Sequence, residues 1–136
     1  MRFNKLIPEL SVSSFKNSLH FYINILRFKI EYQREESKFA MISFQESQLM
    51  IEEINDHWST GKLEHPFGRG INFQIEVDNI QSILDGLIKN NYPLFVEPKE
   101  NWYRQDDVLL GNKEFLVQDP DGYLLRFAED LGTKPR

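Results

Sequence analysis

The stretch Val12-Ser-Ser-Phe-Lys-Asn-Ser-Leu-His-Phe-Tyr-Ile23 has a counterpart sixty-five positions later, Val77-Asp-Asn-Ile-Gln-Ser-Ile-Leu-Asp-Gly-Leu-Ile88. In each stretch a strand-like segment ends in valine, and apolar residues then recur at the spacing of one helix face. The offset aligns four apolar pairs: Phe15 with Ile80, Leu19 with Leu84, Tyr22 with Leu87, and Ile23 with Ile88. The repeat therefore predicts two copies of one strand–helix–strands unit.

The segments around the two helices complete these units. In the first unit we expect a helix over residues 13–27 and strands over residues 3–12, 28–34, 38–44 and 48–54. In the second we expect a strand over 71–77, a helix capped by Asp78 and ending at Asn91, and strands over 94–96, 113–118 and 123–128. Residues 97–111 are expected to form a polar connection, and residues 131–136 a frayed tail. The predicted fold class is α+β, with two curved sheets facing one another across a ligand cleft.

Composition bounds the domain organisation and the partners. A chain of 136 residues is the length of one domain. We expect a single domain over residues 1–136, made of modules 1–54 and 71–130 joined by a loop over 55–70. The 16 basic and 21 acidic residues give a net charge of −5, and no basic stripe is available to neutralise phosphates. This balance argues against nucleic acid as a partner and mildly favours a cationic ligand.

Cysteine content and apolar runs exclude further classes. The chain has no cysteine, so disulfides, thiolate metal sites and cysteine nucleophiles are excluded. It begins without an apolar signal-peptide region, and no apolar run has the length needed to cross a bilayer. We therefore expect a cytoplasmic protein with no membrane partner.

The loop over residues 55–70 carries two of the three histidines, His57 and His65. Loops of this length in compact domains are usually functional or mobile. The two histidines are eight positions apart, which matches no standard ligand spacing, and His20 falls on the first predicted helix. The pattern leaves open whether the loop closes over a site.

Several motifs together resemble the vicinal oxygen chelate superfamily, which includes glyoxalase I, extradiol dioxygenases, fosfomycin-modifying enzymes and bleomycin resistance proteins. The resemblance is carried by Ile7-Pro-Glu-Leu-Ser-Val, by Ser18-Leu-His-Phe-Tyr with Leu26-Arg-Phe, and by Glu114-Phe-Leu-Val-Gln-Asp-Pro-Asp-Gly-Tyr-Leu. It covers almost the whole chain and implies two βαβββ modules. The closing Asp-Pro-Asp-Gly turn is the most specific motif, although Pro and Gly also supply turn geometry by themselves.

Within the superfamily the chain looks most similar to the bleomycin-resistance branch, through Lys38-Phe39-Ala40 and through Glu100-Asn-Trp102 upstream of the final hairpin. This resemblance implies a homodimer that sequesters a cationic compound and is not an enzyme. It also implies that the first strand, hinged near Pro8, can be exchanged between subunits.

The resemblance places the metal ligands of the superfamily's enzymes at Ile7, Glu52, Asn72 and Arg126. Only Glu52 is a competent ligand, because an isoleucine cannot coordinate, an amide is a weak donor and a guanidinium repels a metal. A catalytic zinc site normally has three protein ligands. We therefore expect no metal cofactor and no catalytic residues, and we expect Arg126 to pair with Glu52.

Binding in a cleft without metal depends on rings and carboxylates. Phe39, Trp102 and Tyr103 are the predicted stacking surfaces, since aromatic faces with nearby acids attract planar cations. Glu52, Trp58 and Arg126 are further candidate binding residues, and simple core packing remains an alternative for Phe39. The predicted function is non-catalytic binding and sequestration of a small cationic or aromatic compound.

Two alternatives remain open. One is a metal-dependent lyase, transferase or dioxygenase of the same superfamily with displaced ligands. The other is a regulatory or immunity-type binding domain whose ligand is unrelated to any antibiotic. The sequence does not identify the ligand, and it does not decide whether bleomycin itself is bound.

Overall fold

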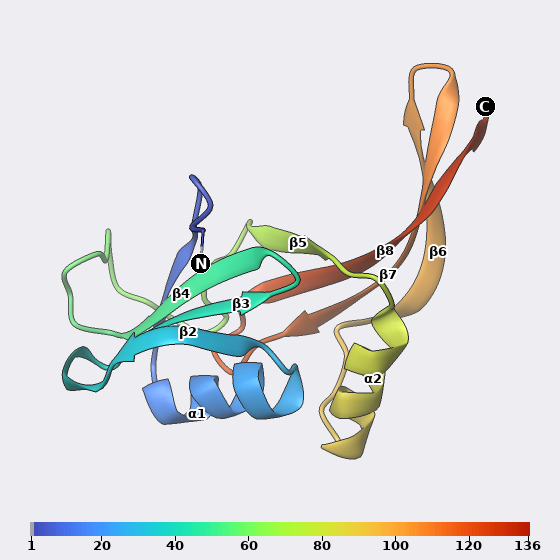
Figure 1. Cartoon of the computed structure of the whole chain (residues 1–136). Coiled ribbons are helices and arrows are strands. Elements are labelled where there is room, and N and C mark those ends of the chain that lie inside the picture. The colour runs from blue at the N-terminus through green and yellow to red at the C-terminus, as the bar shows by residue number, and fades with distance from the viewer. Residues whose placement is uncertain (1) are drawn as a thin grey trace. The chain divides into compact units, whose positions relative to one another are not determined.

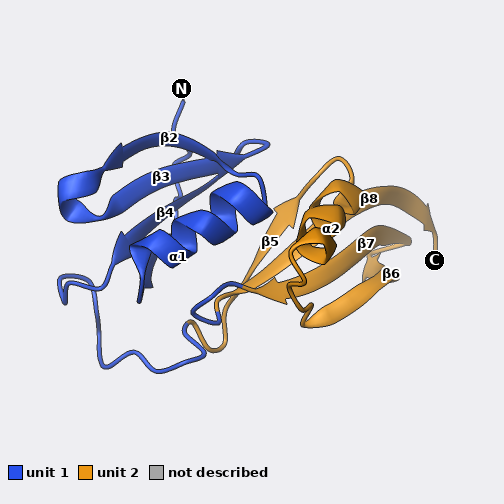
Figure 2. Cartoon of the chain, turned by 90° about the horizontal axis from the view of Figure 1, so that it is seen from below, with its two compact units in different colours: residues 1–67, 119–122 blue, residues 68–118, 123–136 orange. Residues whose placement is uncertain are grey.

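The computed structural model describes residues 2–136 and divides into two compact units (Figure 2). Unit 1 runs to Phe67 and also includes Asp119–Gly122, whereas unit 2 consists of Gly68–Gln118 and Tyr123–Arg136. Each unit holds one mixed four-stranded sheet and one main helix. The predicted α+β class with two βαβββ-type modules is confirmed. The extent of the single domain and the cleft between its sheets stay predictions.

The sheet of unit 1 is built from β1 (Glu9–Val12), β2 (Lys29–Arg34), β3 (Phe39–Phe44) and β4 (Ser47–Glu53). Its strand order is β1-β4-β3-β2, in which β1 is parallel to β4 and the other pairs are antiparallel (Figure 1). A 3₁₀ turn at Glu35–Ser37 joins β2 to β3.

Unit 2 repeats this topology with longer strands. Its elements are β5 (Asn72–Glu76), α2 (Ile80–Lys89), β6 (Val96–Gln105), β7 (Val108–Gln118) and β8 (Leu124–Pro135). The strand order is β5-β8-β7-β6, and again only the first pair is parallel.

In each unit one face of the sheet packs beneath its helix and forms the core. The alternation of strand side chains sends every second residue to this face, and the residues buried there include Leu10, Val12, Ile42, Leu49 and Ile51 in unit 1 and Ile75, Phe115, Val117, Leu125 and Phe127 in unit 2. Fully burying one such side chain contributes about 1.5–3 kcal/mol. We call the other face of each sheet its open face.

The first helix differs from its prediction in the way it continues. After α1 (Phe15–Leu19) the chain forms a π-helical segment over His20–Ile25, in which the Leu26 amide donates to the Phe21 carbonyl. The wider turn shifts the buried face, so that the side chains in the core are those of Ser18, Phe21, Tyr22, Ile25 and Leu26. Periodicity of 3.6 could not reveal this shift.

The second helix is capped one residue later than expected. Its N-cap is Asn79 and not Asp78, because the Asn79 side chain accepts from the Gln81 amide at 2.7 Å. Ile80, Leu84 and Leu87 are buried as expected, but Ile88 is 67% exposed. Residue 88 is therefore one position beyond the buried stripe. The predicted repeat of the core face holds in full for Tyr22 and Leu87 alone among the four pairs, since Phe15, Leu19 and Ile23 are only half-buried.

The polar connection and the frayed tail predicted in the second module are wrong. Residues 96–118 form the β6–β7 hairpin, and β8 continues to Pro135, where it pairs with Val108. Together they extend past β5 as a three-stranded arm (Figure 1). Backbone pairing with β7 holds the polar residues of β6 and of the end of β8 in strands although their side chains are solvated.

The first strand is shorter than expected. It begins at Glu9, directly after Pro8, whose carbonyl accepts from the Met50 amide at 2.9 Å. The preceding residues attach to unit 1 through Gln48, whose side chain accepts from the Asn4 amide and donates to the Arg2 carbonyl. Hydrogen bonds to a side chain therefore hold residues 2–4, where backbone strand pairing was expected.

The closing turn Asp119–Gly122 belongs to unit 1 and is held there by polar contacts. The Asp119 carboxylate accepts from the Tyr22 hydroxyl at 2.8 Å, and the Asp121 carboxylate accepts from both the amide and the hydroxyl of Ser13. These contacts give the closing motif a structural role.

None of the helices within residues 2–136 has the length and apolarity needed to cross a bilayer.

Candidate functional site

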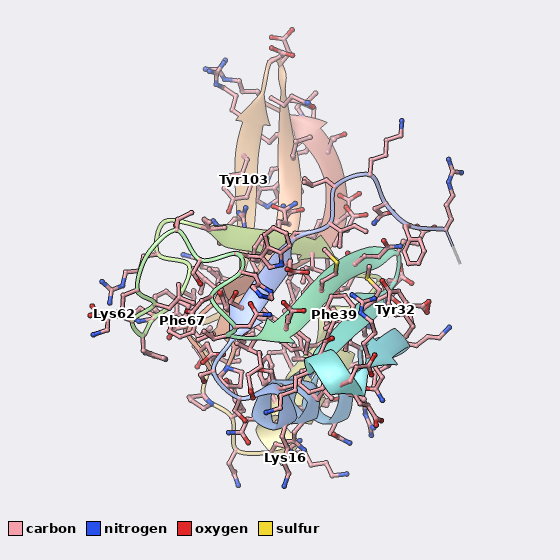
Figure 3. The ribbon with its side chains drawn as sticks, turned by 90° about the vertical axis from the view of Figure 1, so that its left-hand side faces the viewer. Lys16, Tyr32, Phe39, Lys62, Phe67 and Tyr103 are labelled. Atoms are coloured by element: carbon pink, nitrogen blue, oxygen red, sulfur yellow. The ribbon has the colours of Figure 1, made fainter. Side chains whose placement is uncertain are left out.

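The open face of unit 1 carries a ring platform formed by Tyr32 and Phe39. The two ring centroids are 5.9 Å apart, and Figure 3 shows the side chains together on β2 and β3. The guanidinium of Arg34 lies over this platform, 4.1 Å from the Phe39 centroid and 5.7 Å from that of Tyr32. Strand register explains the arrangement, since Arg34 and Phe39 are direct partners across the 3₁₀ turn. The platform therefore already binds one planar cation, its own arginine.

Two carboxylates lie on the same face beside the platform. Glu52 on β4 is the register partner of Phe39, and Glu9 lies on the neighbouring strand β1. Burial and then repulsion by the Glu52 carboxylate raise the pKa of Glu9, although the Arg34 guanidinium partly offsets this rise. Unit 1 thus presents rings, one guanidinium and two carboxylates on one sheet face.

The platform residues differ in their exposure. Phe39 is only 2% exposed, whereas Tyr32 is 39% exposed, and the ring of Phe3 meets Tyr32 edge-on at 6.1 Å. Arg34 covers one face of the Phe39 ring, so a ligand that stacks on this face has to displace it. Phe39 is therefore a recessed stacking surface.

The open face of unit 2 holds a cavity of about 340 Å³. Its polar lining comes from all four strands and comprises Asn72, Lys99, Asn101, Tyr103, Glu114 and Arg126. A neighbouring hollow of about 470 Å³ shares Tyr103 and Arg126 and adds two acids, Glu76 and Asp130. Hydrogen-bonding groups dominate this face, in contrast to the rings of unit 1.

Glu114 organises the polar groups of this cavity. Its side chain is only 4% exposed, and one of its oxygens, Oε1, accepts from the Tyr103 hydroxyl and from the Asn101 amide. The other oxygen, Oε2, is 3.9 Å from Nη1 of Arg126 and has no hydrogen-bond partner among the described residues. The hydrogen bond to the Glu114 carboxylate, followed by desolvation, raises the pKa of Tyr103 above its usual range.

The sequence predicts one stacking surface that includes both Trp102 and Tyr103, but the structure places the two rings on opposite faces of the sheet. The two are neighbours on β6, so their side chains point to opposite faces. The Trp102 ring packs directly on Gly111, where an added Cβ would lie 2.5 Å from the ring, and the Lys134 ammonium is 4.0 Å from its centroid. Only Tyr103 faces the cavity, and a stacking role for Trp102 stays a prediction.

The remaining predicted site residues lie in different places. Glu52 accepts from the Asn55 side chain at 2.7 Å, and Trp58 is 72% exposed in the following loop. Arg126 is in unit 2 and its ionic partner there is Glu114, whereas Glu52 belongs to unit 1. The expected pairing of Arg126 with Glu52 stays a prediction.

The donor chemistry does not fit the superfamily's metal site. Of the four expected positions, Ile7 precedes β1, Asn72 begins β5 and Arg126 carries a guanidinium, so Glu52 is the sole anionic donor among them. Within residues 2–136 no three His, Asp or Glu side chains are grouped as ligands of one ion. A metal bound by this chain would need other residues.

Sequence reasoning missed several residues of both faces. These are Glu9, Tyr32 and Arg34 in unit 1 and Lys99, Asn101 and Glu114 in unit 2. A hairpin register across Glu35–Ser37 would have placed Arg34 opposite Phe39. Recognition of β6 as a strand would have placed Asn101 and Tyr103 on one face.

Comparison with known proteins agrees with this architecture. The family model described as Glyoxalase/Bleomycin resistance protein/Dioxygenase superfamily matches residues 4–127, and none of the curated proteins matches significantly in sequence. The structure is similar to TioX from a Micromonospora species, with a TM-score of 0.72, 11% identity, and coverage of 94% of this chain and 99% of TioX. It is also similar to a superfamily member from Alicyclobacillus acidocaldarius, with a TM-score of 0.66, 15% identity, and coverage of 94% and 92%.

A further similar structure is that of the genomically encoded fosfomycin resistance protein FosX from Listeria monocytogenes. The TM-score is 0.58 at 19% identity, with coverage of 94% of this chain and 92% of FosX. Likeness to these structures, at such identities, establishes the fold alone. The match of the family model over most of the sequence goes further, and by it this chain belongs to the Glyoxalase/Bleomycin resistance protein/Dioxygenase superfamily.

Proposed function

We propose that the protein binds and sequesters a small planar cation, or an aromatic compound that carries one, without transforming it. The observation that carries this proposal is the Arg34 guanidinium stacked 4.1 Å above Phe39. A surface that already stacks one planar cation offers the ring area and the potential that an external one requires. The ligand would take the place of Arg34.

The charge of this face supports a cationic ligand. Two carboxylates, Glu9 and Glu52, lie beside one guanidinium, so the face carries a net charge of −1 (two negative charges and one positive). Burial is the main cause of the raised pKa of Glu9, and repulsion by the Glu52 carboxylate adds to it. Displacement of Arg34 by a ligand would leave both acids available to the incoming cation.

The test is calorimetric titration with proflavine, a planar aromatic cation, and with acridine, its uncharged parent at pH 8. We expect proflavine to bind saturably and at least several-fold more tightly than acridine, since only the cation gains from the acids. Glu52→Gln should weaken proflavine about tenfold, a loss on the order of 1.4 kcal/mol. Arg34→Ala should tighten it, because the ring of Phe39 becomes accessible.

Glu46→Gln is the matched control, since this exposed acid lies in the turn between β3 and β4, at the opposite end of β3 from Phe39. Equal binding of proflavine and acridine, or weaker binding by the Arg34→Ala variant, would contradict the proposal. Metal-free bleomycin is titrated in the same way, and binding at one molecule per subunit would support the bleomycin-resistance branch.

A homodimer that exchanges its first strand near Pro8 belongs to the same proposal. The short β1 and the side-chain attachment of residues 2–5 through Gln48 support it, because few backbone hydrogen bonds would be broken by exchange. Sedimentation velocity measures the oligomeric state. A monomer at concentrations of tens of micromolar would contradict the proposal.

The second candidate function is metal-dependent catalysis with displaced ligands. The observation that favours it is the pair Glu9 and Glu52, two carboxylates close enough for one to raise the pKa of the other, since hard divalent ions prefer such oxygen donors. Elemental analysis of freshly purified protein tests this function. One metal per chain, lost in Glu52→Ala together with turnover, would replace sequestration by catalysis.

A further inference from the structure

The cavity of unit 2 has a charge opposite to that of the platform in unit 1. Its charged lining consists of Lys99, Arg126 and Glu114, which gives a net charge of +1 (two positive and one negative). Leu116 and Val96 supply its apolar floor, and the ring of Tyr103, 42% exposed, stands at its side. The cavity therefore combines positive charge with an aromatic wall.

Glu114 does not use up the donors of Arg126. Its Oε1 is occupied by Tyr103 and Asn101, and its Oε2 stays 3.9 Å from Nη1 of Arg126, beyond hydrogen-bonding distance. Nε of Arg126 is buried and has no hydrogen-bond partner among the described residues, although the side chain as a whole is 29% exposed. A hydrogen bond to the Tyr103 hydroxyl oxygen also engages the guanidinium, but a guanidinium has five donors, so this one bond leaves donors over where Arg126 lines the cavity.

The unused donors of Arg126 indicate which class of ligand this cavity would bind. A guanidinium pairs with planar oxyanions through two parallel hydrogen bonds, and it does so most readily with a carboxylate. Lys99 adds a second cation, and the amides of Asn72 and Asn101 add polar groups at the rim. Because Tyr103 donates its proton to Glu114, its ring and not its hydroxyl proton is left for the ligand.

We propose that the cavity of unit 2 binds a small aromatic carboxylate, with the carboxylate on Arg126 and Lys99 and the aromatic ring against Tyr103. All residues of this site belong to unit 2, and none of them is part of the cation platform. Its test uses other ligands and other variants, so the failure of one proposal leaves the other standing.

Calorimetry with benzoate tests the site, and benzamide is the uncharged control of the same shape. We expect one benzoate per chain and at least tenfold weaker binding of benzamide. Lys99→Gln should weaken benzoate several-fold, whereas Lys113→Gln should have no effect, because this exposed lysine points to the opposite face of β7 from Glu114. Arg126→Gln should abolish binding.

Arg126→Gln leaves Glu114 without its ionic partner and can fail to fold, in which case Lys99→Gln and Tyr103→Leu decide the matter. Absence of benzoate binding by the wild-type protein would overturn the proposal, as would equal affinity for benzamide. An equal loss of benzoate affinity in the Lys99→Gln and Lys113→Gln variants would show that only overall charge matters. This result would also overturn the proposal. Inorganic phosphate that binds as tightly as benzoate would overturn the assignment to an aromatic carboxylate.

Discussion

The open faces of the two units have the same strand topology and opposite chemistry. In unit 1 the face is built from rings and carries two acids beside Arg34, whereas in unit 2 it is built from amides, a phenol and a guanidinium around the buried Glu114. The helix-covered faces, by contrast, are both apolar. Duplication therefore preserves the core, which the fold requires, and leaves the open face free to differ in what it recognises.

The largest effect should come from removing the buried carboxylate of unit 2. Glu114→Ala leaves Tyr103, Asn101 and Arg126 without their common partner, and the unfolding free energy should fall by about 3 kcal/mol. Urea denaturation measures the change. Glu97→Ala, at an exposed acid on β6, is the control and should change stability by less than about 0.5 kcal/mol. Equal losses would show that Glu114 has no special role.

Two tyrosines, one in each unit, donate hydrogen bonds to the residues at and just after the end of β7. The Tyr22 hydroxyl donates to the buried Asp119 carboxylate at 2.8 Å, and the Tyr92 hydroxyl donates to the Gln118 carbonyl at 2.7 Å. Tyr22→Phe should cost about 2 kcal/mol and Tyr92→Phe about 1 kcal/mol, because hydrogen bonds to charged acceptors are stronger. Thermal denaturation of both variants measures the difference, and the reverse order would contradict a structural role for the closing turn.

Alkaline pH should probe unit 2. The hydrogen bond to Glu114 raises the pKa of Tyr103 in the folded state, so the folded protein holds a proton that the unfolded chain loses near pH 10. This contribution to stability is complete below about pH 10 and is lost as pH rises through the folded pKa. Since Tyr103 is 42% exposed, we expect less than about 1 kcal/mol. The stability difference between wild type and Tyr103→Phe, measured in urea from pH 8 to 11, should therefore shrink.

Lowering the pH tests unit 1, and the expected change in unfolding free energy is the smallest of those predicted. Burial and the Glu52 charge raise the pKa of Glu9 in the folded state, so lowering the pH through that pKa protonates the folded protein first. The wild type should gain stability relative to Glu9→Gln down to about pH 4, the unfolded pKa, by under about 1 kcal/mol. Glu53 in the same unit should act in the opposite direction.

The pKa of Glu53 is lowered by its hydrogen bond from Lys38 and then by that from the Phe15 amide. Its contribution is present above the unfolded pKa and is lost on acidification. Comparison of Glu53→Gln with Glu9→Gln from pH 7 to 4 separates the two carboxylates. Slopes of the same sign would show that the folded state does not raise the pKa of Glu9.

The duplication, the α+β class and most strand positions could be predicted from the amino-acid sequence. Apolar residues buried under a helix must follow the period of their element, and this constraint is local enough to read from residues such as Val12, Ile80 and Leu87. The superfamily could be recognised for the same reason, since its motifs are largely those of core and turn.

The length of the arm and the composition of both open faces depend on strand pairing and could not be predicted. The polar residues of β6 carry no periodic signal, because their strand depends on backbone pairing with β7 and not on burial of an apolar face. Arg34 meets Phe39, and Tyr103 meets Glu114, only through strand register. Pairing between distant segments fixes that register, and single-residue preferences do not contain it.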